Sequence, residues 1–240
     1  MIKEVERKMY NILVCDDDKD IVEAISIYLE TAGYNVIKAY DGFEALKCMN
    51  ESEIHLIIID IMMPNMDGIR ATRKIREESH VPVIFLSAKS EDADKILGLD
   101  VGADDYVTKP FNPLELVARV KSQIRRYTEF SGVAEENTDD RLIKNGGLVI
   151  NDSAKSVTVD GDEVRLTPLE YNILKFLTEN RGRVYTTAQI YEAVWEEDSI
   201  ASDNIIAVHI RHIREKIEIN PKEPRYLKVV WGQGYKIEKL

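Results

Sequence analysis

The stretch LIIIDIMMPNMDG, residues 56–68, runs four apolar residues into Asp60 and then into a loop that contains Pro64, Asn65 and Gly68. A continuous apolar run bounded by turn residues predicts a strand covered on both faces of a parallel sheet. An unpaired carboxylate is costly there, so Asp60 needs partners. In open α/β sheets the carboxyl ends of the strands border the ligand crevice, which favours a chemical role. Taken alone, a capping or turn aspartate fits equally well.

The first half of the chain alternates apolar strands with amphipathic helices. Strands are expected at 11–15, 34–40, 55–60, 81–87 and 103–108, and helices from about residue 21 and over 42–50, 68–78, 92–100 and 113–127. Right-handed crossovers then predict an α/β fold, a doubly wound five-stranded parallel sheet with helices on both faces. We place this domain at residues 10–127.

The second half has a different pattern. Residues 128–144 are polar and acidic without periodicity, which indicates a linker, and a second domain is expected over residues 145–240. Short strands with a hairpin at Asp160-Gly161 come first. A helix follows, with Thr167 as N-cap, Pro168 at its first position and Glu170 completing a capping box. Two further helices and a closing hairpin around residues 232–234 make this an α+β winged-helix arrangement.

Composition sets limits on function. The chain has 240 residues, 44% hydrophobic and 31% charged, as expected for two globular domains. No apolar stretch approaches the roughly 18 to 20 residues of a membrane span, and the polar start lacks a secretory signal, so we expect a cytoplasmic protein. Cys15 and Cys48 show no metal-binding spacing and are expected to be structural.

Charge is unevenly distributed. Residues 1–140 hold 17 Lys and Arg against 28 Asp and Glu, whereas residues 141–240 hold 15 of each. The acidic first half argues against nucleic-acid contact there. The neutral second half could bind DNA only through local clustering of its basic residues.

Several polar side chains are expected at the same sheet edge as Asp60. Asp16 and Asp17 follow the first strand, Ser87 ends the fourth and Lys109 ends the fifth. Three crowded carboxylates repel one another unless a hard cation joins them, which favours Mg²⁺. With Lys109 and Ser87 the set suits phosphoryl transfer to Asp60 as nucleophile.

The motifs DDD, DIMMPNMDG, SAK and DDYVTKPF resemble the receiver domain of two-component response regulators. The resemblance implies a flavodoxin-like fold and phosphorylation of Asp60 by a partner sensor histidine kinase. It also implies Mg²⁺ bound by Asp17 and Asp60, by Asp16 through water and by the Met62 carbonyl. Ser87 and Tyr106 would form the switch pair, although Tyr106 by itself fits core packing better.

The helix expected at 203–218 carries a core stripe of isoleucines, Ile206, Ile210, Ile213 and Ile217. Its opposite face is predicted to hold a mixed set: Asn204, Val208, Arg211, His212 and Glu215. Such a face is usually only solvated. The same face also suits a helix that binds in the major groove of DNA, because His209 and Arg214 flank Arg211. The adjoining hairpin would then be a wing that contacts the DNA backbone through Lys228 and Lys236.

The segments LTPLEYNIL, VHIRHIREKI and VVWGQGYKI are similar to the winged-helix domain of OmpR/PhoB-type regulators. This implies DNA-contact positions at His209, Arg211, His212 and Arg214, and a loop at 195–203 that faces RNA polymerase. His212 and Trp231 stand where arginines are common, which puts the groove contacts in question. Trp231, RRYTEFSG and KIEKL look most like the vancomycin-resistance regulator VanR and its relatives.

The same resemblance implies a homodimer, after phosphorylation, through the fourth helix, fifth strand and fifth helix. Charges there permit cross-chain pairs of Lys95 with Glu115, Asp105 with Arg119, and Asp104 with Arg126. Intrachain surface pairs are the alternative.

These observations predict a phosphorylation-activated transcription factor, not an enzyme with an external substrate, that binds direct-repeat promoter DNA as a dimer. One rival is an aspartate-nucleophile phosphohydrolase, which needs a second general acid near Asp60; Ile61 and Met62 supply none. The other is a phosphorylation-dependent adaptor without DNA affinity.

Overall fold

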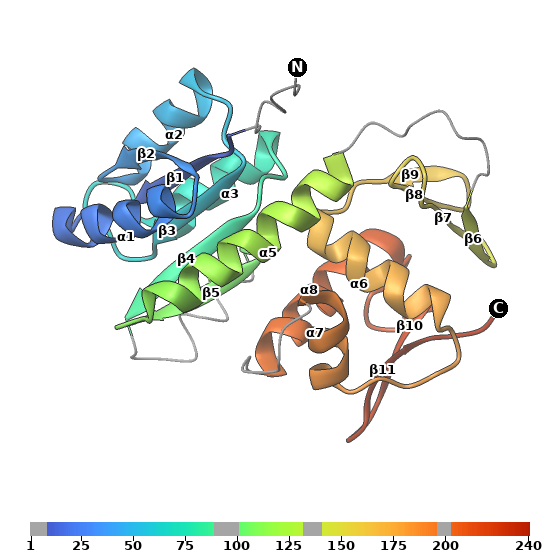
Figure 1. The fold of residues 1–240 in the computed structure, drawn as a ribbon. Coiled ribbons are helices and arrows are strands. Elements are labelled where there is room, and N and C mark those ends of the chain that lie inside the picture. The colour runs from blue at the N-terminus through green and yellow to red at the C-terminus, as the bar shows by residue number, and fades with distance from the viewer. Residues whose placement is uncertain (1–8, 89–100, 132–140, 196–202) are drawn as a thin grey trace, which may run out of the picture. The chain divides into compact units, whose positions relative to one another are not determined.

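The computed structural model describes residues 9–88, 101–131, 141–195 and 203–240, and the chain divides into two compact units, Met1–Ile124 and Arg125–Leu240 (Figure 1). Each unit has its own hydrophobic core. Among the described helices, none is long and apolar enough to cross a membrane.

The first unit is built on a five-stranded parallel sheet in the order β2-β1-β3-β4-β5. Its strands are β1 (Asn11–Cys15), β2 (Asn35–Ala39), β3 (Leu56–Asp60), β4 (Val83–Ala88) and β5 (Asp105–Lys109). β3 is central and buried along its whole length. Because all strands run the same way, their carboxyl ends meet at one edge.

Helices cover both faces of this sheet. They are α1 (Lys19–Thr31), α2 (Gly42–Glu51), α3 (Gly68–Glu78) and α5 (Pro113–Ser131). Apolar residues of α1 and α5 pack with β1, β3, β4 and β5 into one core layer on one face, and α2 and α3 pack together on the other. The predicted doubly wound fold is confirmed.

Helix starts in the first unit follow capping chemistry. Asp18, Asp41 and Asp67 are the N-caps of α1, α2 and α3, and each side chain accepts hydrogen bonds from backbone amides of its first turn. The helix expected at 92–100 lies outside the described residues. α5 continues to Ser131, four residues beyond its expected end at 127, because TEFS still permits helical hydrogen bonding and no Pro or Gly interrupts it.

The second unit opens with a four-stranded antiparallel sheet, β6 (Leu142–Asn145), β7 (Leu148–Asn151), β8 (Ser156–Val159) and β9 (Asp162–Val164). The hairpin predicted at Asp160-Gly161 is present, with positive φ at both residues. β6 begins at Leu142, inside the stretch 128–144 that is expected to be a linker, and Ile143 pairs with Ile150 across the sheet.

Three helices and a hairpin complete this unit: α6 (Pro168–Glu179), α7 (Thr187–Trp195), α8 (Asp203–Ile217), β10 (Leu227–Val230) and β11 (Gly234–Ile237). The capping box of Thr167 and Glu170 is formed as predicted. The four stripe isoleucines of α8 are at most 2% exposed. These elements are the winged-helix arrangement expected from the sequence.

Candidate functional site

Asp60 ends the central strand β3 and is 6% exposed. β1 lies beside β3, with Cys15 opposite Ile59, so Asp16 continues into the same edge. Asp16 is fully buried and Asp17 is exposed. A pocket of about 410 Å³ opens here; its lining includes the three aspartates, Met62, Ser87 and Lys109. The structure therefore brings together the site residues that parallel strands predicted.

Lys109 links the two buried carboxylates. Its Nζ lies 2.5 Å from Oδ2 of Asp16 and 2.7 Å from Oδ1 of Asp60. The remaining oxygens are held by backbone amides, because Asp18 N donates to Asp16 Oδ1 and Met62 N donates to Asp60 Oδ2. The Lys109-Pro110 peptide bond is cis. Asp60 thus has the partners that a buried carboxylate requires.

The carboxylates also fit a divalent cation. Asp16, Asp17 and Asp60 each offer one oxygen within 4.8 Å of the other two. Hard oxygen donors in an open pocket, which leaves room for retained waters, are the environment that Mg²⁺ prefers. Met62 is 73% exposed at the pocket rim.

Electrostatics at the site reflect competition between burial and pairing. Burial raises the pKa of Asp60 above its ordinary value, while hydrogen bonding and the charge of Lys109 oppose that rise. Burial acts to lower the pKa of Lys109, but its hydrogen bonds to Asp16 and Asp60 outweigh burial and the net shift is upward. Lys109 is therefore a fixed positive charge beside the nucleophile candidate.

Ser87 is 3% exposed and lines the pocket. Its hydroxyl donates to the carbonyl oxygen of Ala88 at 3.0 Å, so it is already hydrogen-bonded at this edge. Tyr106 is half-buried on β5, directly opposite Phe85 of β4. The strand register therefore places Tyr106 two pairs before Ser87 and Thr108.

The loop after Asp60 has supports that the sequence analysis missed. Asn65 Nδ2 donates to Asp41 Oδ2 at 2.9 Å, so the N-cap of α2 also holds this loop. A Cβ added at Gly68 would overlap the carbonyl oxygen of Asp60, and one at Gly42 would lie 2.6 Å from Cγ of Met66. The sequence did carry a signal for these supports: an Asp-Gly pair, Asp41-Gly42 and Asp67-Gly68, stands directly before each of two helical patterns. Glycine at such a position permits a close approach of another backbone segment.

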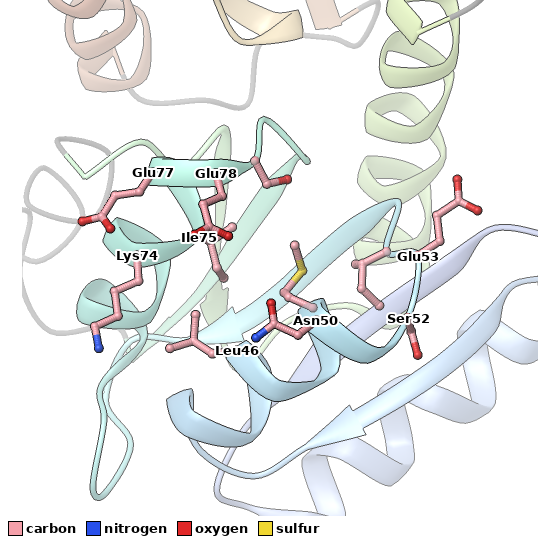
Figure 2. A pocket seen from close by; sticks show the side chains of 11 residues that line it. Leu46, Asn50, Ser52, Glu53, Lys74, Ile75, Glu77 and Glu78 are labelled. Atoms are coloured by element: carbon pink, nitrogen blue, oxygen red, sulfur yellow. The ribbon is translucent and has the colours of Figure 1, made fainter.

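A groove larger than the acidic pocket lies at the opposite edge of the sheet, between the carboxyl ends of α2 and α3 (Figure 2). It measures about 600 Å³ and combines apolar side chains such as Leu46 and Ile75 with Glu53, Glu77, Glu78 and Lys74. None of the predicted site residues lines it. The smaller acidic pocket is the better site for chemistry, because Lys109 lies there within 2.7 Å of two buried carboxylates, those of Asp16 and Asp60.

α8 presents a narrower polar face than its helical pattern predicts. Arg211 and Glu215 are exposed, together with Ala207, whereas Val208, His209 and His212 are 6%, 2% and 8% exposed. His209 lies against Trp195 with ring centroids 6.2 Å apart, and Arg214 Nε donates to the carbonyl of Leu227. The side chain of Asn204 lies outside the described residues. The expectation of a solvated face holds for Arg211 and Glu215 and is wrong for Val208 and His212, because α6 and α7 pack against the helix.

The β10–β11 hairpin carries the candidate wing residues. Trp231 is 89% exposed in the turn between the two strands. Lys228 and Lys236 are directly opposite each other in the ladder, and Lys236 also pairs with Glu238 at 3.0 Å. One hairpin thus carries an exposed indole in its turn and two lysines on its strands.

The residues proposed for a dimer interface make intrachain contacts. Asp105 pairs with Arg119 at 2.9 Å, Arg119 pairs with Glu115 at 2.9 Å, and Asp104 pairs with Arg76 at 2.8 Å. Lys95 lies outside the described residues, and Arg126 belongs to the second unit. The alternative of intrachain pairing is thus realised for four of the six side chains: Asp104, Asp105, Glu115 and Arg119.

Comparison with known proteins agrees with both units. The protein-family model described as response regulator receiver domain matches residues 12–121. A second family model, described as transcriptional regulatory protein, C terminal, matches residues 161–237. Regulatory protein VanR of Enterococcus faecium is 46% identical over 229 residues, which cover 95% of this chain and 98% of that protein. The alkaline phosphatase synthesis transcriptional regulatory protein PhoP of Bacillus subtilis is 41% identical over 232 residues, 95% of this chain and 96% of that protein. A solved RitR mutant covers 96% of this chain and 100% of its own at a TM-score of 0.72 and 23% identity, a likeness of fold alone.

A parallel sheet with an acidic edge, followed by a winged-helix unit, defines a receiver domain joined to a DNA-binding domain. The chain belongs to the two-component response regulators of the OmpR/PhoB type, and it is a transcription regulator with a receiver and a DNA-binding domain. The predicted resemblance to VanR is confirmed by the relatives.

Proposed function

We propose that Asp60 accepts a phosphoryl group from a partner sensor histidine kinase, with Mg²⁺ bound in the acidic pocket, and that this modification activates promoter binding. The observation that carries the proposal is the convergence of Asp16, Asp60 and Lys109 in one pocket, within 2.7 Å of the lysine nitrogen. A carboxylate nucleophile beside a fixed cation suits phosphoryl transfer.

Each residue then has a defined task. Asp60 supplies the attacking carboxylate oxygen, and Lys109 stabilises negative charge on the transferring group. Asp16, Asp17 and Asp60, with the Met62 carbonyl, would hold Mg²⁺, which supplies further charge neutralisation of the phosphoryl oxygens when bound. Ser87 lines the same pocket, so its hydroxyl can leave the Ala88 carbonyl and donate to a phosphoryl oxygen, and Tyr106 turns inward in response.

The test is intact-mass spectrometry after incubation of the full chain with Mg²⁺ and acetyl phosphate. We expect the wild type to gain one phosphoryl group and Asp60→Asn to gain none. Asp67→Asn is the matched control, because Asp67 lies in the same loop, acts as the N-cap of α3, and asparagine preserves a cap. Phosphorylation of Asp60→Asn, or equal loss in Asp67→Asn, would contradict the assignment.

The rival phosphohydrolase predicts a different stoichiometry. A hydrolase would release many equivalents of phosphate from the external donor at a rate limited by its own turnover. For this chain we expect one phosphoryl group per molecule, followed by slow loss. Among the described residues that line the pocket, there is no histidine and no carboxyl group other than those of Asp16, Asp17, Asp18 and Asp60, so none is left to act as the additional general acid of a hydrolase.

For the second unit we propose that α8 enters the major groove of direct-repeat promoter DNA and that the β10–β11 wing grips the adjacent backbone. Arg211 is the exposed cation at the centre of the helix face, and Trp231 is the exposed wing side chain. Asn204, Val208, His209 and Arg214 belong to the same helix and remain candidate contacts, and His212 hydrogen-bonds Arg211. Affinity that falls steeply with salt separates this proposal from an adaptor without DNA affinity.

Assembly is the remaining part of the proposal. Phosphorylation would favour a homodimer through α5, β5 and the segment 92–100, and residues 195–203 would face RNA polymerase. Asp104, Asp105, Glu115, Arg119 and Arg126 would then exchange intrachain for cross-chain partners, and Lys95 would pair with Glu115 of the other chain. Such charge pairs set the register of an interface more than its affinity. Size-exclusion chromatography before and after acetyl phosphate should show a shift towards dimer for the wild type only, not for Asp60→Asn.

A further inference from the structure

The exposed guanidinium of Arg211 is held at two points. Its Nε lies 3.4 Å from Oε1 of Glu215, and its Nη2 lies 3.2 Å from Nε2 of His212. These two contacts use adjacent atoms of one rigid planar group, so together they set the plane of the guanidinium. A fixed plane matters because an arginine reads guanine through two parallel hydrogen bonds.

The contact with Arg211 decides the state of the His212 ring. A guanidinium only donates hydrogen bonds, so Nε2 of His212 must accept and cannot carry a proton. The proton of the neutral ring then sits on Nδ1, which faces Oε1 of Glu170 at 4.0 Å. Glu170 is 3% exposed and anchored, since its Oε2 accepts from Lys216 Nζ at 2.5 Å and from Thr167 N at 2.8 Å.

From this geometry we infer that His212 is a positioning residue for DNA recognition: in its neutral form, oriented by Glu170 of α6, it holds Arg211 for a base contact and does not itself touch DNA. This inference rests on the proposed DNA binding by α8. His212 is buried, whereas Arg211 is exposed, so the two side chains have the access that these two tasks require.

The charges around His212 support a neutral ring. Burial lowers the pKa of His212, Glu170 opposes that shift, and Arg211 adds to it. Glu215 and Lys216 of the same helix act in opposite directions, and the ring of His209 lies 6.3 Å away. A proton added at Nε2 would remove the acceptor and place two cations side by side, so acid should release Arg211.

The test begins with selection of binding sites from a randomised pool of double-stranded DNA by the phosphorylated full chain. Fluorescence anisotropy then gives affinities for the selected site and for each single-base variant. Failure to select any site would defeat the proposed DNA binding itself, which keeps that failure separate from the present inference. Arg211→Ala identifies the base that Arg211 reads, as the position where discrimination is lost.

We expect His212→Ala to lose discrimination at that same base, on the order of tenfold, with affinity for unrelated DNA unchanged. His212→Gln should retain most of it, because the side-chain amide oxygen can accept from Arg211. In the Arg211→Ala background, His212→Ala should have no further effect. Discrimination by the wild type should also fall as the pH drops below the ordinary pKa of histidine, about 6.5, because the pKa of His212 is lowered, while that of His212→Gln should not fall.

Additive losses in the double variant would show that His212 contacts DNA independently and would overturn the inference. So would a His212→Gln variant that behaves like His212→Ala while circular dichroism shows both folded. If His212→Ala does not fold, base discrimination is compared between the wild type and His212→Gln over a range of pH. The same pH dependence in both proteins would contradict a positioning role for His212.

Discussion

At the scale of single residues, the acidic pocket depends on one lysine. Lys109 is the cation between Asp16 and Asp60, whose side chains are 1% and 8% exposed. Removing one partner of a buried ion pair leaves an uncompensated charge, which typically costs several kcal/mol. Lys109 therefore stabilises the fold as well as the proposed chemistry.

Lys109→Met is expected to lower the free energy of unfolding by about 3 kcal/mol, and Mg²⁺ should restore part of the loss by replacing the missing cation. Urea unfolding followed by circular dichroism, with and without Mg²⁺, measures both effects. Lys121→Met is the control, because Lys121 is exposed on the same chain segment that forms α5. Equal destabilisation in the control, or no recovery with Mg²⁺, would contradict the pairing role.

At the scale of elements, the start of α3 is packed directly against the end of β3. Gly68 N donates to the carbonyl of Ile61 at 3.0 Å, and the position of a Cβ there is taken by the Asp60 carbonyl. This contact couples the geometry of Asp60 to the entry of the helix.

Gly68→Ala should therefore destabilise the first unit by about 1 to 3 kcal/mol and reduce phosphoryl uptake at Asp60. Gly33→Ala is the contrast: Gly33 has φ +90° but nothing within 4 Å of an added Cβ. It should cost about 1 kcal/mol through backbone strain and leave phosphorylation unchanged. The same mass spectrometry and urea unfolding measure both, and reduced uptake in both variants would argue for a general loss of stability.

In the second unit, Asp152 joins the β7–β8 turn to α6. It accepts hydrogen bonds from Lys155, Lys175 and the hydroxyl of Tyr171, all within 2.9 Å. Burial alone would raise its pKa, but these bonds outweigh burial and lower the pKa from 3.8 to about 2. Because the folded value lies below the unfolded one, the stabilisation is complete above pH 4 and is lost as pH falls towards 2.

Asp152→Asn should accordingly lower the free energy of unfolding by about 2 kcal/mol at pH 7, and the difference from wild type should shrink as the pH approaches 2. Urea titrations at several pH values measure it by tryptophan fluorescence, which reports the second unit because Trp195 and Trp231 are the chain's two tryptophans. A difference that does not change with pH would show that ionisation of Asp152 is not the cause.

At the scale of the whole molecule, each unit buries its own apolar residues. Substitutions in one core should then act on one unfolding transition. We expect Asp152→Asn to shift the transition seen by tryptophan fluorescence and Lys109→Met to shift the remaining part of the circular dichroism signal. Equal shifts of both signals by either variant would indicate one cooperative unit.

The sequence by itself determined the order of elements and the composition of the acidic pocket. Apolar runs and helical periodicity encode which face of an element is buried, and parallel strands bring their carboxyl ends to one edge, so Asp16, Asp60, Ser87 and Lys109 could be grouped without coordinates. The helix cap at Thr167 and the hairpin turn at Asp160 could also be predicted, because each depends only on residues close by in the sequence, and the structure has both.

Only the tertiary structure decided which partners those residues meet. Lys109 and Asp16 are 93 residues apart, and their contact depends on how β1, β3 and β5 pack. The helical pattern of α8 placed Val208 and His212 on its open face, but neighbouring helices bury them and leave Arg211 exposed. Glu170 seemed only a capping residue, yet it also holds Lys216 and faces His212. The periodicity of apolar residues predicts that one face of a helix or strand is buried. It does not predict which side chains pack on that face, because they come from segments distant in the sequence.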